Sequence, residues 1–207
     1  NLIHFLGGLV LLWKIKQQKT IYGLSFDTQL CFVLSTIARC MWSLDTRLVE
    51  NRLAYLELFC SILAVFLLVY HMHRYRYTGS KSTWWPLQSQ TLIPVALIAA
   101  FLFHPGQKWW SIQILVAFTM YLEAVALIPQ LWLMHNIVEI ETLTSHYVGL
   151  LILSRIVRMF FWLSLYLRGE QFIGLFVADL LHSICSVDYF FLWCHKLRRG
   201  GMLMYKT

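Results

Sequence analysis

Seven apolar runs constrain this chain more than any other feature of its sequence. They fall at roughly 2–13, 30–44, 53–70, 91–103, 112–134, 147–167 and 172–193. A helix needs about 20 apolar residues to cross a bilayer, and most of these runs approach that length. Only 13% of the residues are charged and 59% are hydrophobic, whereas soluble domains average about 25% charged residues. We therefore predict an all-α integral membrane protein, with seven transmembrane helices in a single membrane domain over residues 1–207.

The distribution of lysine and arginine predicts how the chain is oriented in the membrane. Four basic residues lie on the side of the second, fourth and sixth loops, namely Arg47, Arg52, Lys108 and Arg168. The other side carries more: Lys14, Lys16, Lys19, Arg74, Arg76, Lys81, Lys196, Arg198, Arg199 and Lys206. Because cytoplasmic loops are enriched in these residues, we expect a lumenal N-terminus and a cytosolic C-terminus with a basic tail at 196–207. The net charge of +7 then reflects topology, and no nucleic-acid partner is expected.

A repeat becomes visible when the chain is shifted by 119 residues, so that residue 12 meets residue 131. The matching pairs are Leu12-Trp13 with Leu131-Trp132, Leu24-Ser25 with Leu143-Thr144, Ser35-x-Ile37-x-Arg39 with Ser154-x-Ile156-x-Arg158, and Tyr70 with Tyr189. This register predicts a 3+1+3 arrangement of parallel repeats, at about 1–77 and 111–195, joined by a helix at about 88–104. Parallel repeats of this kind place a ligand site at their interface near mid-membrane.

Ionisable residues inside the apolar runs are the candidate site residues. They are Arg39, Glu57, Glu123, Arg155, Arg158, Asp179, His182 and Asp188. Each costs about 2.5–3.5 kcal/mol in the membrane on insertion scales, so it normally faces a polar cavity or a partner. Arg155 and Arg158 share a helix face because they are three residues apart, and guanidinium groups bind carboxylates with two parallel hydrogen bonds.

Two interpretations of these arginines remain open. They bind an anionic ligand, or each pairs internally, with Glu123 as the obvious partner. Three arginines against one nearby carboxylate favour the ligand, with Glu123 as a counter-ion. Pro129-Gln130 predicts a break in the fifth span, either a hinge or a static bend, where the Gln130 amide can satisfy a freed backbone group. No spacing of cysteine or histidine indicates a metal, and no cofactor is expected.

Several motifs resemble those of one known family. The run 121–134, YLEAVALIPQLWLM, is followed at 139–151 by EIETLTSHYVGLL. Further similarity lies in Tyr22-Gly23-Leu24-Ser25 with Gln29, in Arg39 and Trp162, and in Asp188-Tyr-Phe-Phe. Together they resemble the KDEL receptor family of endoplasmic reticulum lumen protein retaining receptors, over nearly the whole chain.

The resemblance implies a seven-helix fold similar to sugar and PQ-loop transporters. It also implies a receptor that moves between Golgi and endoplasmic reticulum membranes, binds C-terminal Lys-Asp-Glu-Leu-like tetrapeptides of lumenal proteins in the acidic Golgi, and presents a basic tail to the retrograde vesicle coat.

The resemblance also assigns roles to individual residues. Arg39 and Arg155 match arginines that engage signal carboxylates, Glu123 matches the acid paired with the helix-six arginine, and Trp162 matches an aromatic residue near the signal's lysine. His4 matches the histidine of a pH latch. The tyrosine that partners this histidine in the family is replaced by Ser154 in this chain. Asp188 matches an acid near the cytosolic end of helix seven. The candidates for conformational change and for contact with the coat are this residue and the basic residues of the tail, Lys196, Arg198, Arg199 and Lys206.

Departures from the family pattern predict altered signal specificity. The positions that differ are Cys40, Trp42, Gln113, Val116, Ser154, Arg158 and Leu165. Carboxylate capture is kept, while recognition of the signal's lysine is largely lost. The alternative function is a PQ-loop-like carrier of a carboxylate-bearing small molecule. We do not expect an enzyme, because its candidate residues are spread around one helix: Asp179, His182, Asp188 and His195.

Overall fold

The part of the chain that the structure describes is almost entirely helical, as predicted for an all-α protein. The computed structural model describes residues 2–45, 52–79, 84–104, 112–136, 139–140, 142–168, 173–199 and 203–204. The helices are α1 (Leu2–Gln18), α2 (Phe26–Asp45), α3 (Arg52–Arg74), α4 (Ser89–Leu102), α5 (Ile112–Ala126), α6 (Ile128–Asn136), α7 (Thr142–Leu167) and α8 (Ile173–Arg199). Short elements are the 3-10 turns η1 (Arg76–Thr78) and η2 (Trp85–Leu87) and the strands β1 (Glu139–Ile140) and β2 (Leu203–Met204).

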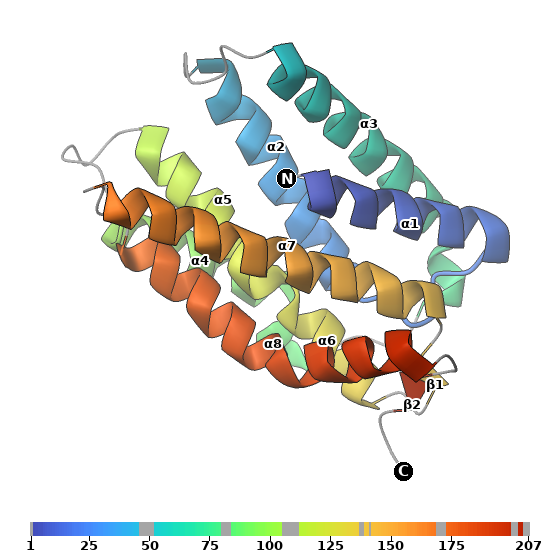
Figure 1. Ribbon diagram of the computed structural model, residues 1–207. Helices are drawn as coiled ribbons and strands as arrows, with labels where there is room; N and C mark the ends of the chain where they lie inside the picture. The colour runs from blue at the N-terminus through green and yellow to red at the C-terminus, as the bar shows by residue number, and fades with distance from the viewer. Residues whose placement is uncertain are drawn as a thin grey trace.

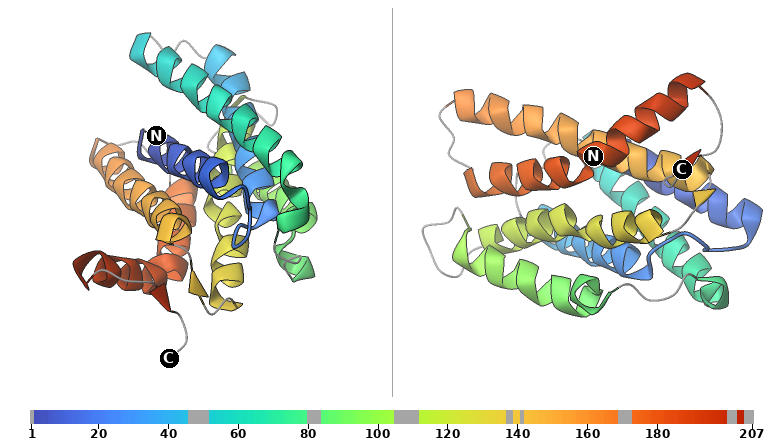
Figure 2. Two further views of the ribbon diagram at one scale, coloured as in Figure 1. Left: turned by 90° about the vertical axis from the view of Figure 1, so that its right-hand side faces the viewer. Right: turned by 90° about the horizontal axis from the view of Figure 1, so that it is seen from below.

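The helices form one bundle in which the most extensive contacts join distant parts of the sequence (Figures 1 and 2). Helix α5 packs against α2 and α4, α1 packs against α7 and α3, and α8 packs against α7 and α5. Strand β1 pairs antiparallel with β2, with Glu139 opposite Met204. This strand pair lies at the same end of the bundle as the turn between α1 and α2.

Many large apolar side chains lie on the outer surface of the bundle, which suits a membrane environment. Two stretches, Ile112–Asn136 and Thr144–Ser164, are long and apolar enough to cross a bilayer, and Leu58–Arg74 and Ser89–Leu102 are shorter apolar helices. Large aromatic side chains point outward, including those of Phe59, Phe66, Phe160 and Phe191. The exposure of so many large apolar side chains suits contact with lipid better than contact with water.

Lys14 is buried and is not a solvated charge of the first loop. The sequence analysis had counted it among the basic residues that face the cytosol. Helix α1 continues past the predicted end of the first run to Gln18, and Lys14 is 0% exposed. Its Nζ donates to the carbonyl oxygen of Tyr22 at 2.9 Å and to Oγ1 of Thr144 at 2.7 Å. The ammonium therefore joins α1 to the turn that follows it and to the first turn of α7.

The predicted break occurs between α5 and α6, at Leu127. Pro129 has no N–H to offer the preceding turn. Gln130 is fully buried, but its amide does not bond to the backbone of its own helix as we had expected. Its Oε1 accepts from the N–H of Ser25, and its Nε2 donates to the carbonyl oxygen of Gly23, both at 2.7 Å. Gly23 has a φ of +75°, which favours glycine. Gln130 thereby holds the turn that leads into α2.

Close packing joins α7 to α8 near the end that carries β1. Gly149 faces the ring of Trp193, and a Cβ at this position would overlap the indole. The Trp193 indole also donates to Nδ1 of His146 at 3.3 Å. Helix α8 continues through the start of the predicted tail to Arg199, while the side chains of Lys196, Arg198 and Arg199, and all of Lys206, lie outside the described residues.

Candidate ligand-binding site

A cavity of about 480 Å³ collects most of the predicted site residues. The side chains around it come from α1, α2, α5 and α7. They are Ile3, Arg39, Met120, Glu123, Ser154, Arg155, Val157, Arg158, Phe161 and Trp162. Arg39 also borders a second, smaller and mainly apolar cavity that reaches Gln29 and Tyr147. The tertiary structure thus places Arg39 of α2 around the same space as Arg155 and Arg158 of α7, although the two helices are far apart in the sequence.

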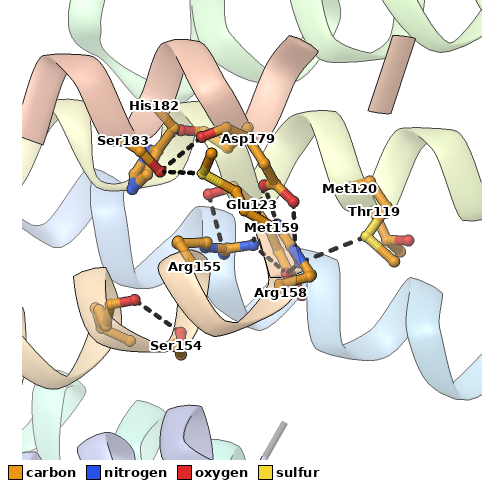
Figure 3. Close-up of polar contacts among 12 residues, drawn as sticks. Thr119, Met120, Glu123, Ser154, Arg155, Arg158, Met159, Asp179, His182 and Ser183 are labelled. Atoms are coloured by element: carbon orange, nitrogen blue, oxygen red, sulfur yellow. Dashed lines mark hydrogen bonds and ion pairs between the residues drawn. The ribbon is translucent and has the colours of Figure 1, made fainter. Parts of the chain in front are cut away.

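Glu123 is the centre of the charged groups that line this cavity (Figure 3). Its Oε2 lies 2.8 Å from Nη1 of Arg155 and 2.7 Å from Nη1 of Arg158. Arg155 also donates from Nη2 to the Glu123 carbonyl oxygen at 3.1 Å, and the Ser35 hydroxyl donates to Oε1 at 3.0 Å. Arg155 is 3% exposed. Buried ions of this kind are tolerated only when they are paired and hydrogen-bonded.

Asp179 supplies a second carboxylate that the sequence analysis left without a partner. Its side chain accepts from Nε and Nη2 of Arg158, the former at 2.6 Å, and from the indole N–H of Trp162 at 2.9 Å. Oδ1 also lies 3.9 Å from Nη1 of Arg155. The expected imbalance of three arginines against one acid is therefore wrong. The spacing of Asp179 on its own helix does not reveal this pairing, because only the packing of α8 against α7 creates it.

His182 lies one turn after Asp179, at the contact of α8 with α5. It is 4% exposed, and its Nδ1 contacts the carbonyl oxygen of Ala124. Because a carbonyl oxygen only accepts, Nδ1 carries the proton, while Nε2 has no hydrogen-bond partner among the described residues. Asp188 and His195 are exposed further along α8. The four polar residues considered for an enzyme therefore do not converge.

The two residues of the predicted pH latch differ in what the structure describes. Ser154 borders the cavity, and its hydroxyl donates to the carbonyl oxygen of Leu151 in its own helix at 2.7 Å. His4 belongs to α1, but its side chain lies outside the described residues. The neighbouring Ile3 lines the same cavity as Ser154, so the first turn of α1 borders the site.

The structure is a helical bundle with a charged cavity, and comparison with known proteins shows that it belongs to a class of membrane receptors. Residues 20–165 match the family described as ER lumen protein retaining receptor. This chain belongs to that family, as the resemblance predicted. ER lumen protein-retaining receptor 2 of Xenopus tropicalis is 29% identical over 207 residues, covering 98% of this chain and 94% of the relative. The proteins of the same name from Danio rerio and Homo sapiens are each 28% identical over 206 residues, with the same coverage.

We predict that Glu123→Gln strongly destabilises the protein. The substitution keeps the shape of the side chain but removes the ionised acceptor shared by Arg155 and Arg158, and breaking a buried ion pair costs about 3–5 kcal/mol. Thermal unfolding in detergent measures the effect. Ser183→Ala is the control, because the Ser183 hydroxyl bonds to Met159 Sδ and to the Asp179 carbonyl oxygen and to no ionised group among the described residues. Equal stability of the two variants would contradict a structural role for the ion cluster.

Proposed function

We propose that this protein binds C-terminal retention signals of lumenal proteins in the Golgi and returns these proteins to the endoplasmic reticulum. Membership of the family of ER lumen protein retaining receptors supports this function. The observation that carries it is the convergence of Arg39, Arg155 and Arg158 on one cavity, since guanidinium groups are suited to carboxylates. The alternative function, a carrier of small carboxylates, receives no support from the family match.

We further propose seven membrane spans in a 3+1+3 arrangement, with a lumenal N-terminus and a cytosolic C-terminus. The shift of 119 residues relates α1 to α5 and α6, and relates α2 to α7. Under that relation the contact of α1 with α7 corresponds to the contact of α5 with α2, and both contacts are extensive. The pairing of β1 with β2 supports a common side for the loop at 139–140 and the tail.

The cytosolic end supplies the proposed contact with the retrograde vesicle coat. Asp188 lies on α8 about two turns before His195 and is exposed. The basic groups of the tail, Lys196, Arg198, Arg199 and Lys206, follow on the same helix and beyond it. We propose that ligand binding changes the position of α8, which is tied to the cavity through Asp179 and Arg158, and thereby the presentation of the tail.

The free carboxylate of the signal is the group that the proposed receptor requires. Arg39→Lys keeps the charge but removes the planar fork that binds a carboxylate through two hydrogen bonds. We expect this variant, and Arg155→Ala, to lose binding of a peptide with a free C-terminus. We expect amidation of the peptide to have the same effect in the wild type. The measurement is peptide affinity in detergent or nanodiscs, and undiminished binding of the amidated peptide would refute carboxylate capture.

We propose that the signal's lysine contributes little to recognition. The resemblance places signal contacts at Trp42, Gln113 and Val116, and these side chains carry no charge to pair with an ammonium group. Trp162, the aromatic residue expected near that lysine, donates its indole N–H to Asp179. We expect a peptide library to show weak preference at the fourth position from the C-terminus. Strict selection of Lys-Asp-Glu-Leu would argue against altered specificity.

We expect acid to strengthen ligand binding through His4. An unperturbed histidine titrates near pH ~6.5, so protonation adds a cation to a site for anions as the pH falls through that value. Peptide affinity of the wild type should rise between neutral and acidic pH, and His4→Ala should flatten this response. Because the Ser154 hydroxyl already donates to Leu151, we expect Ser154→Tyr to steepen it. A wild-type affinity that does not change with pH would remove the latch.

A further inference from the structure

The turn that follows α1 is held against the turn that follows α3. The N–H of Ile21 donates to Oγ1 of Thr78 at 3.1 Å, and the Ile21 side chain lies against Gly79. Figure 1 shows that α1 and α3 finish at the same end of the bundle. Two segments that are 57 residues apart in the sequence therefore form one surface at this end.

Four exposed basic side chains belong to this surface, which we call the basic patch. They are Lys16, Lys19, Arg74 and Arg76. Among the described residues, none of the four forms an ion pair with a carboxylate. Asp27, an acid at the same end, instead accepts from the N–H and the hydroxyl of Ser89. The positive-inside rule explains how many basic residues lie on one side of the membrane, but it does not require two turns to bring them together.

Exposed aromatic side chains flank the basic patch. Trp13 is 59% exposed and lies three residues before Lys16, on the same face of α1. Tyr77 is 83% exposed, and its hydroxyl accepts from Nη2 of Arg76 at 2.6 Å. The Arg76 guanidinium also lies over this ring, 4.7 Å from its centre. Tryptophan and tyrosine are enriched where a membrane meets water, so these rings favour a position of the basic patch at the level of the lipid headgroups.

Lys19 has a backbone conformation that favours glycine. Its φ is +53°, and its N–H donates to the carbonyl oxygen of Ile15 at 2.9 Å, which closes the last turn of α1. Helices commonly end with glycine in this left-handed conformation, and any other residue there costs conformational energy. Local geometry therefore does not explain a lysine at this position, whereas a role for its charge does.

A cluster of cations from two segments suits a compact anion with more than one negative charge. A phosphate monoester carries about −1.5 to −2 charges at pH 7, and arginine binds phosphate oxygens through two parallel hydrogen bonds. Basic clusters immediately beside a transmembrane helix bind anionic lipids. We propose that the basic patch binds a lipid headgroup that carries a phosphate monoester, as a ligand separate from the retention signal. In the proposed orientation this end faces the cytosolic leaflet, where anionic lipids are enriched.

Lipid affinity of the full chain in detergent, with no peptide present, tests this site. The probes are phosphatidylcholine, phosphatidylserine and a phosphatidylinositol monophosphate with the same acyl chains, and native mass spectrometry counts the bound lipids. We expect the wild type to bind the monophosphate lipid about tenfold more tightly than phosphatidylserine. Lys16→Gln/Lys19→Gln and Arg74→Gln/Arg76→Gln should each weaken this binding about thirtyfold, because each cation adds to the attraction of an anionic headgroup.

Two further variants separate a lipid site from general charge and from local structure. Lys108→Gln/Arg168→Gln removes the same number of positive charges from loops that the sequence predicts on the other side of the membrane, so it should leave the affinity unchanged. Lys19→Gly relieves the positive φ and removes one charge of the basic patch. We expect its thermal stability to be maintained or raised while its affinity for the monophosphate lipid falls about fivefold.

The outcomes are distinct from those that test the retention receptor. Equal wild-type affinity for phosphatidylserine and the monophosphate lipid overturns the site, and so does an equal loss in the control Lys108→Gln/Arg168→Gln. A soluble inositol phosphate that binds as tightly as the lipid contradicts a membrane ligand. The wild-type comparison needs no variant, so misfolding of a variant does not prevent the test. Because no peptide is present, loss of the lipid site leaves the proposed receptor function intact.

Discussion

The buried ion cluster between α5, α7 and α8 is the interaction on which the rest of the site depends. Glu123 lies on α5, Arg155 and Arg158 on α7, and Asp179 on α8, so every ion pair crosses a helix interface. A charge left unpaired in a low-dielectric interior is far more costly than a lost apolar contact. The cluster therefore restricts how these three helices can move relative to one another.

The same arginines stabilise the bundle and line the cavity, so the proposed ligand binding would act directly on the contacts between helices. A ligand carboxylate approaching Arg155 or Arg158 meets groups that already bind Glu123 or Asp179. It adds to these ion pairs or exchanges with them. Either event changes the interaction between α7 and α8, and α8 leads toward the tail. Such a shared network gives ligand binding a direct physical route to a change elsewhere in the bundle.

At the end of the bundle that carries β1, hydrogen bonds of single polar side chains, charged or uncharged, join the helices to one another. Lys14 joins α1 to α7, Gln130 holds the turn before α2, and Asp27 accepts from the N–H and hydroxyl of Ser89 at the start of α4. Each of these bonds satisfies backbone or hydroxyl groups near a helix end. Irregular backbone inside a membrane requires such partners, so these side chains set the positions at which the helices begin.

Much about this protein followed from its sequence alone. The apolar runs predicted the helices, the pair Pro129-Gln130 predicted the break, and local motifs predicted the family, because each depends on neighbouring residues or on short spacings. The partners of Lys14, Gln130 and Asp179 did not follow. Their contacts join residues on different helices, so they depend on how α1, α7 and α8 pack. Sequence shows that a charge enters the membrane, but only the tertiary structure decides which opposite charge compensates it, because the energy of an ion pair depends on distance and burial in space.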